Sequence, residues 1–144
     1  MSEELISAYD IRGTEATGMT VDCAWNAGKA LADWLPEEGS VVVSSTKEYK
    51  KLAEAVIEGL RLQGRDVVDA GQNDKNFVSS YVVTGGMAGA AVVGYDDMEK
   101  VITIEFYQED GKLIDRESGL QAICDSVRAG NFVPAAAKGS LVIL

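Results

Sequence analysis

The chemistry open to this chain is limited by its side chains, because the sequence contains no histidine. Histidine is the usual general base near neutral pH and the commonest metal ligand. Its absence excludes Ser-His-Asp and Cys-His catalysis by this chain alone. The two cysteines, Cys23 and Cys124, lie on apolar stretches far apart in the sequence. This pattern is typical of buried thiols in a reducing compartment, so we expect a cytoplasmic protein.

The first group that could bind a ligand is acidic. Asp96, Asp97 and Glu99 follow a short apolar run. Open α/β sheets often place ligands beyond the carboxyl ends of their strands, so a weak magnesium or calcium site is one interpretation. A solvated turn is the other interpretation, and it is favoured because nothing fixes the spacing of ligands. We therefore predict no metal site in this chain.

The second group is basic. Lys47, Lys50 and Lys51 cluster at the start of a predicted helix. The positive end of a helix dipole could bind an anion there, whereas a solvated helix face is the simpler interpretation. Lys47 is kept as a candidate for binding phosphate, together with Arg12 near the N-terminus.

Length and charge narrow the class of protein. A chain of 144 residues with 47% hydrophobic content is expected to form one domain over residues 1–144. Its 13 basic and 23 acidic residues give a net charge of -10, which would repel nucleic acid. No stretch reaches the roughly 18 apolar residues that span a bilayer, and the acidic start does not resemble a signal peptide. We expect neither nucleic acid nor membrane among the partners.

The elements that must position these side chains alternate between strands and helices. Apolar residues at helical spacing predict four helices, over about 20–35, 74–84 and 116–129, and one with its apolar face at 52–60 that stops at Gly64. β-Branched and apolar runs predict strands at 40–44, 66–71, 90–94 and 101–107. About half a dozen residues separate the last two strands, too few for a crossover helix, so these two should pair antiparallel.

This alternation predicts the fold class. It indicates a three-layer α/β/α domain with a mixed, mostly parallel sheet and one antiparallel strand. The apolar end 141–144 predicts a further strand, which either docks on this domain or leads into another one.

The opening Ala8-Tyr-Asp-Ile-Arg-Gly13 resembles the start of domain one of the α-D-phosphohexomutases, the phosphomannomutase and phosphoglucomutase superfamily. The resemblance continues in order through 24–35, 41–43, 52–60, 66–71, 106–114 and the last helix, and so covers the whole of domain one. It implies a fold like that of phosphoglucomutase domain I. In that family four domains surround a cleft, and a phosphoserine in domain one donates its phosphoryl group to a sugar phosphate through a bisphosphorylated intermediate.

The resemblance ends at the position that would carry the phosphoserine. The family's serine lies in a motif like Thr-Ala-Ser-His-Asn-Pro after a strand, and the matching residues here are Val93-Gly-Tyr-Asp-Asp-Met98. Tyr95 therefore stands in place of the serine and Asp96 in place of the histidine. A phenol would displace the phosphorus, and in-line transfer tolerates little misplacement. Because Asp96 and Asp97 would also repel a phosphate, we predict no catalytic residue in this chain.

By the same resemblance, the rest of the family's machinery belongs to other domains. Magnesium is bound in domain two, the sugar hydroxyls are read by domain three and the phosphate is gripped by domain four. We therefore expect no cofactor here. Arg12 would lie at the edge of the phosphoryl site; as a structural arginine it would instead pair with Asp10 or a backbone carbonyl.

Three hypotheses about function follow. The leading one is a catalytically inactive, stand-alone relative of domain I that acts as a binding or assembly module linked to carbohydrate metabolism, for example as a homodimer. The alternative is a fragment or split subunit of a phosphohexomutase, an intramolecular phosphotransferase, whose other domains lie on a separate chain. The third is weak binding of a sugar phosphate near Arg12 and Lys47.

Overall fold

The computed structural model describes residues 6–36 and 38–144. Within these residues six strands form one sheet in the order β1-β5-β4-β2-β3-β6. The strands are β1 (Ile11–Gly13), β2 (Val41–Ser45), β3 (Val67–Gly71), β4 (Gly89–Asp96), β5 (Val101–Gln108) and β6 (Leu141–Ile143). The α-helices are α1 (Val21–Trp34), α2 (Lys50–Leu62), α3 (Lys75–Thr84) and α4 (Gln121–Ala129). Short helical turns are η2 (Glu15–Thr17), η3 (Lys47–Tyr49) and η4 (Arg116–Leu120).

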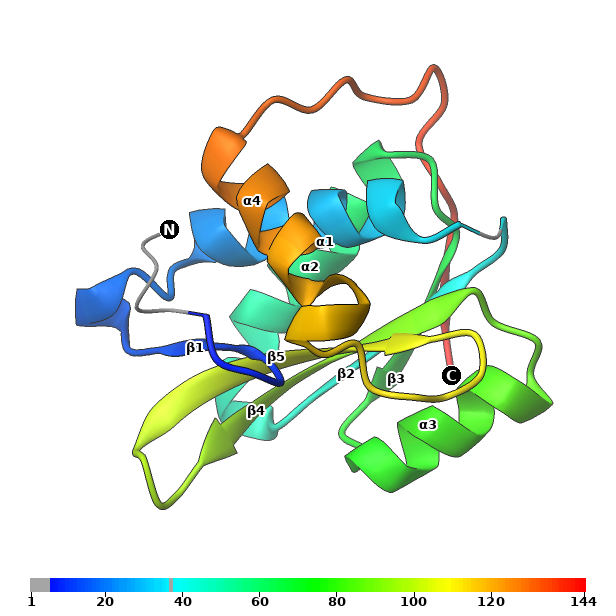
Figure 1. Cartoon of the computed structure of the whole chain (residues 1–144). Helices are drawn as coiled ribbons and strands as arrows, with labels where there is room; N and C mark the ends of the chain where they lie inside the picture. The colour runs from blue at the N-terminus through cyan, green and yellow to red at the C-terminus, as the bar shows by residue number, and fades with distance from the viewer. Residues whose placement is uncertain (1–5, 37) are drawn as a thin grey trace.

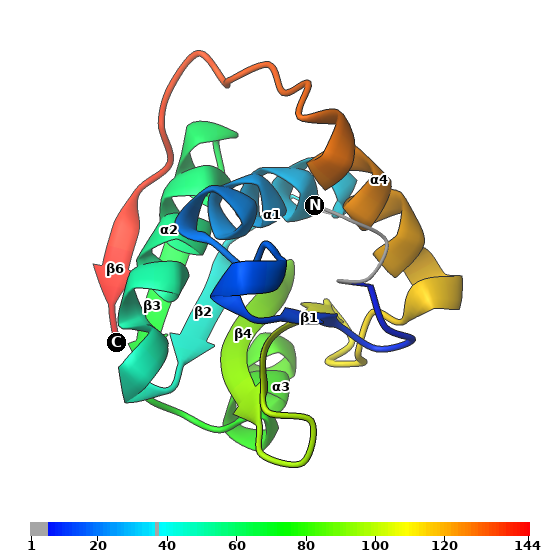
Figure 2. The same ribbon diagram turned by 90° about the vertical axis from the view of Figure 1, so that its left-hand side faces the viewer.

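The sheet lies between two layers of helices (Figure 1). Helices α1, α2 and α4 cover one face, and α3 covers the other (Figures 1 and 2). The larger core cluster fills the first interface and a smaller one, around Val42, Val78 and Tyr107, fills the second. This arrangement confirms the predicted three-layer α/β/α architecture.

The directions of the strands also agree with the prediction. β2 runs parallel to both β3 and β4, and β3 runs parallel to β6. β5 pairs antiparallel with β4 on one side and with β1 on the other. β5 is thus the single strand of the described sheet that runs against the rest, as expected from its short connection to β4.

Local sequence signals set the ends of the helices. The side chain of Thr20 accepts a hydrogen bond from the N–H of Cys23 at the start of α1, and Asp74 does the same for Phe77 at the start of α3. α4 ends at Ala129 and is followed by Gly130, whose φ of 67° is in the left-handed region that favours glycine. These caps explain why the predicted boundaries of the helices are close to the observed ones.

The two central helices of the larger layer cross at very close range. A Cβ atom added to Gly28 of α1 would collide with the carbonyl oxygen of Val56, and one added to Gly59 of α2 would collide with that of Trp25. Glycine at both positions therefore lets the backbones of α1 and α2 approach to contact distance.

The apolar end of the chain forms β6 at the edge of the sheet (Figure 2). Asp66 accepts a hydrogen bond from the N–H of Ser140 at 2.8 Å, and the carbonyl of Asp69 accepts one from the N–H of Leu144 at 2.9 Å. Of the two expectations for this segment, docking on the same domain is confirmed. Its side chains stay largely exposed, with Ile143 at 76%. Over the described ranges, no helix has the length and apolar character needed to cross a bilayer.

Candidate functional site at the end of β4

The residue predicted to replace a phosphoserine lies at the carboxyl end of β4. Tyr95 is 42% exposed, and its ring stacks on Tyr49 with 6.1 Å between ring centroids. Tyr49 belongs to η3, the turn that follows β2, the neighbouring strand. Burial raises the pKa of Tyr49, and the nearby Tyr95 and Glu48 raise it further. The two phenol rings therefore pack against each other where β2 and β4 end.

β4 is longer than the sequence indicated. The predicted strand ended at Gly94, whereas pairing with β5 continues through Tyr95 opposite Ile102 and Asp96 opposite Val101. The reversal uses only 97–100, and Lys100 takes a left-handed φ of 56° there. Tyr95 is consequently part of the ladder instead of lying in a loop beyond the strand.

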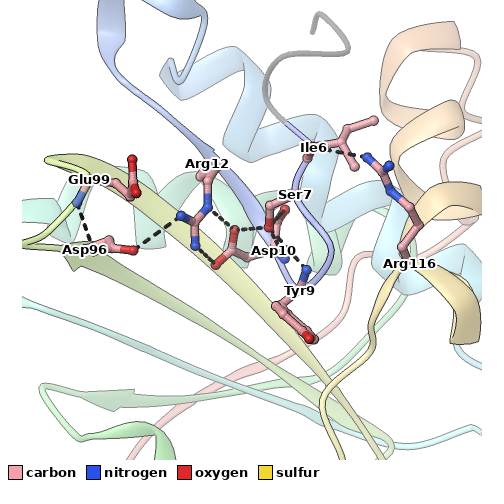
Figure 3. Close-up of polar contacts among 8 residues, drawn as sticks. All are labelled: Ile6, Ser7, Tyr9, Asp10, Arg12, Asp96, Glu99 and Arg116. Atoms are coloured by element: carbon pink, nitrogen blue, oxygen red, sulfur yellow. Dashed lines mark hydrogen bonds and ion pairs between the residues drawn. The ribbon is translucent and has the colours of Figure 1, made fainter.

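Arg12 lies across the sheet from this strand end, between two carboxylates (Figure 3). Its Nε and Nη2 atoms donate to the two oxygens of Asp10 at 2.7 and 2.9 Å, and Nη1 donates to Asp96 at 3.3 Å. The register explains this reach, because Arg12 pairs with Thr103 of β5, which pairs with Gly94 of β4. The hydrogen bonds that Arg12 donates to Asp10, and then the charges of Asp10 and Asp96, raise the pKa of Arg12 above its ordinary value. The expected pair with Asp10 is present, and Asp96 extends it.

Asp10 itself is buried, at 4% exposure, and is held by a tight turn. The hydroxyl of Ser7 donates to its carboxylate at 2.8 Å, and the same oxygen of Ser7 accepts the N–H groups of Tyr9 and Asp10 (Figure 3). A second contact fastens this segment, since Arg116 donates to the carbonyl of Ile6 at 3.1 Å. Hydrogen bonds from Ser7, just before the hexapeptide, thus fix the carboxylate of Asp10 that binds Arg12.

Asp96 organises the acidic turn after β4. Its carboxylate accepts the backbone N–H groups of Met98 at 3.0 Å and Glu99 at 3.2 Å. The hydrogen bond from Glu99 is the main cause that lowers the pKa of Asp96, and Met98 and Arg12 add to it. In the part of the chain that the structure describes, Asp96, Asp97 and Glu99 do not converge as a set of metal ligands. They form a hydrogen-bonded turn at the surface.

The hollow around Tyr95 has an unfavourable charge for a phosphate. Four carboxylates and two cations are among the residues that line it: Asp10, Asp96, Asp97, Glu105, Arg12 and Lys75. Arg12 is already neutralised by its two ion pairs. Burial raises the pKa of Glu105, with the negative charge of Asp10 acting in the same direction and the charge of Lys75 opposing it. Because carboxylates outnumber cations in this hollow, its electrostatic potential opposes the entry of an anion.

Lys47, the other candidate for phosphate binding, lies elsewhere. It lines a separate hollow with Ser45, Lys50 and Asp69, between the start of α2 and the ends of β2, β3 and β6. The third hypothesis has a sugar phosphate bind near both Arg12 and Lys47, but the structure does not bring these two residues together. Arg12 is on β1 and Lys47 is in η3, which follows β2, and β4 and β5 lie between β1 and β2.

Comparison with known proteins places the chain in a family. Residues 3–133 match the family described as phosphoglucomutase/phosphomannomutase, alpha/beta/alpha domain I. The chain belongs to this family. It is 32% identical to the phosphomannomutase of Salmonella typhimurium over 145 aligned positions and 31% identical to a protein named phosphohexose mutases of Xanthomonas campestris over 134. These alignments cover 92% and 90% of the chain.

The chain matches only one part of these relatives. It spans 30% of the Salmonella protein and 29% of the Xanthomonas protein. A solved phosphoglucomutase/phosphomannomutase family protein from Burkholderia thailandensis superposes on the whole chain with a TM-score of 0.78 at 22% identity, over 33% of its own length. The resemblance to domain I is therefore confirmed, and so is the domain I-like fold.

Of the contacts that define the site, the sequence predicted the pair of Arg12 with Asp10 but neither the pair with Asp96 nor the stacking of Tyr49 on Tyr95. Arg12 and Asp96 are 84 residues apart, so their ion pair depends on the order and register of β1, β5 and β4. The stacking of Tyr49 on Tyr95 depends in the same way on the β2–β4 pairing. Only an explicit alignment of these strands could have found either contact.

Proposed function

We propose that this chain is a phosphohexomutase domain I that does not donate phosphoryl groups and serves as a binding or assembly module linked to carbohydrate metabolism. One observation carries the proposal: Arg12 is held by Asp10 and Asp96, beside a tyrosine at the position matched to the family's phosphoserine. A guanidinium that already donates hydrogen bonds to two carboxylates has few free N–H groups and little uncompensated charge with which to bind a phosphate.

The side chains around Tyr95 at the end of β4 also support the absence of phosphoryl transfer. A serine hydroxyl at position 95 would need a free cation and an approachable face, whereas Tyr95 presents a bulky phenol stacked on Tyr49. The four carboxylates of the hollow oppose the approach of a sugar phosphate. Phosphoryl transfer depends on positioning and on stabilising negative charge, and both are unfavourable here.

Labelling with radioactive glucose 1,6-bisphosphate tests this proposal. We expect no acid-stable label on the chain, while the phosphomannomutase of Escherichia coli, a relative 31% identical, serves as the positive control. The Tyr95→Ser variant should also stay unlabelled, because Asp96 still occupies Arg12. Label that is present on the native chain and absent from Tyr95→Phe would refute the proposal.

A second function is supported by the exposed end of the sheet. The four apolar residues of the C-terminal segment are all more than a third exposed: Leu141, Val142, Ile143 and Leu144. Such a surface suits assembly, either as a homodimer or with a separate chain that carries the other domains of a phosphohexomutase. In that assembly the site would belong to an intramolecular phosphotransferase acting on sugar phosphates.

Sedimentation velocity distinguishes these assemblies from a lone domain. If β6 is the contact, the native chain should sediment as a dimer at high concentration and Ile143→Lys as a monomer. Lys112→Glu, a change of charge on an exposed turn away from β6, is the matched control. A native chain that stays monomeric at all concentrations would leave only assembly with a different chain, which a pull-down with phosphohexomutase domains then tests.

The thiols support a reducing compartment, and we propose the cytoplasm. Cys23 and Cys124 are both buried and unpaired with each other. Burial raises the pKa of Cys124 to about 12 and also raises that of Cys23. Such thiols should react slowly with a thiol reagent until the protein unfolds. Recovery of the protein in a secreted fraction would contradict the proposed location.

A further inference from the structure

We propose that β6 pairs antiparallel with β6 of a second copy of this chain, so that two sheets join into one across a twofold axis. This pairing would be the mode of the homodimer proposed above, and it rests on that homodimer. β6 is the last strand in the sheet order, and among the described residues no element lies beyond it (Figure 2). Its outer side is therefore an open row of backbone donors and acceptors, which another extended strand can satisfy.

The pairing of β6 with β3 determines which backbone groups of β6 are free. Two hydrogen bonds at 2.9 Å show which residues face β3: the N–H of Val67 to the carbonyl of Ser140, and the N–H of Leu144 to the carbonyl of Asp69. Because the backbone groups of successive residues point to opposite sides of a strand, Val142 faces β3 as well. Leu141 and Ile143 therefore direct their N–H and C=O groups to the open edge.

Gly139, the next residue with this orientation, is already engaged. Its N–H donates to the carbonyl of Arg61 at 2.8 Å, and its carbonyl accepts from Nε of Arg61 at 2.9 Å. A twofold axis beside Val142 places Leu141 opposite Ile143 of the second copy, and so satisfies the free groups of both residues. With Leu141 opposite itself, Ile143 would instead face the engaged Gly139. The free groups thus select one register, in which the strand matches its own copy.

The side chains also suit pairing between copies. All three residues of the strand are exposed, from 39% to 76%: Leu141, Val142 and Ile143. Natural edge strands commonly prevent pairing with charged residues or proline, and 139–144 contains neither. Lys138, just before this segment, is bound to Glu58 at 2.6 Å. Two copies that each carry a net charge of -10 can therefore meet here without placing charged side chains opposite each other.

Disulfide cross-linking of cysteine variants tests the register. In Val142→Cys the new residue faces its own copy at a non-hydrogen-bonded position, where Cα atoms lie about 4.5 Å apart, within reach of a disulfide. Leu141→Cys and Ile143→Cys are matched controls, because each of these residues faces the other and not itself. Under mild copper-catalysed air oxidation we expect Val142→Cys to form covalent dimers at least about fivefold faster than either control. The native chain, whose two cysteines are buried, should form none.

Met98→Cys supplies the rate of random encounter, because Met98 is 92% exposed and lies on the turn after β4. A rate for Val142→Cys no higher than this one would refute pairing with a second copy. Equal rates at all three positions of β6 would refute the register. If the native chain sediments as a dimer without this cross-link, the pairing fails and the proposed homodimer stands. If it also sediments as a monomer, the homodimer fails as well.

Ile143→Pro separates backbone pairing from apolar contact. The change removes an N–H at the open edge and leaves those that face β3, so the domain should keep its fold. Each copy then loses one hydrogen bond, and we expect dimerisation to weaken by about tenfold or more. Ile143→Val keeps the N–H and should weaken it by less than about threefold. Native-like NMR spectra establish that both variants fold, and equal dimerisation of the two would refute backbone pairing.

Discussion

Asp96 determines what Arg12 can do at the end of β4. Its carboxylate is held by the backbone of the turn and faces the guanidinium that Asp10 already binds. A histidine or asparagine at this position would leave Arg12 with one carboxylate partner instead of two. At the residue scale, the proposed absence of phosphoryl transfer therefore rests on two residues that act together: Tyr95 at the position matched to the family's phosphoserine, and Asp96, which pairs with Arg12.

The ionisation of Asp96 should show this arrangement. Its folded pKa is lowered, so its contribution to stability is present above the ordinary value of about 3.9 and is lost as the pH falls through the lowered value. We expect the native chain to be more stable than Asp96→Asn at pH 7, and the difference to shrink at pH 3. Urea unfolding at both pH values measures it, and a difference that is the same at both would contradict the assignment.

Replacing Arg12 by a neutral residue should lower the free energy of unfolding. Arg12→Gln leaves the buried carboxylate of Asp10 without its main partner, which should lower the free energy of unfolding by about 2–4 kcal/mol. The double variant Asp10→Asn/Arg12→Gln should recover part of this loss, because no buried charge then remains. Urea unfolding of the native chain, both single variants and the double variant gives the coupling energy, and a coupling near zero would contradict a structural ion pair.

At the scale of elements, periodicity and caps were sufficient to predict most of the fold. The apolar spacing of α1 and its cap at Thr20, or the strand at 66–71, can be recognised without tertiary information. The extension of β4 through Asp96 could not, because antiparallel pairing to β5 overrides the polar residues at its end. The docking of β6 also depends on a distant partner, Asp66, and the candidate site depends on the register of several strands.

The crossing of α1 and α2 should be sensitive to one added methyl group. Gly28→Ala would push its Cβ atom against the carbonyl oxygen of Val56, and we expect a loss of about 1–3 kcal/mol in the free energy of unfolding. Gly94→Ala is the matched control, because the nearest atom would be 3.5 Å away and the backbone there is unstrained. Thermal unfolding compares the two. A larger loss for Gly94→Ala than for Gly28→Ala would show that the crossing is not as close as described.

At the scale of the whole molecule, both hollows lie at the same edge of the sheet, where the parallel strands β2, β3, β4 and β6 end. Open α/β folds bind ligands at this edge. The two hollows differ in charge. Four carboxylates and two cations line the hollow at the end of β4, whereas in the hollow beside α2 Lys47 and Lys50 balance Glu54 and Asp69. Any anion that the domain attracts despite its net charge of -10 should therefore be found beside α2, not beside Tyr95.

The most direct test of the central claim is the intact mass of the native chain after prolonged incubation with excess glucose 1,6-bisphosphate. If Asp10 and Asp96 keep Arg12 engaged and Tyr95 cannot take the place of a serine, the mass will remain that of the unmodified polypeptide. An added phosphoryl group that fragmentation assigns to Tyr95 would contradict the account.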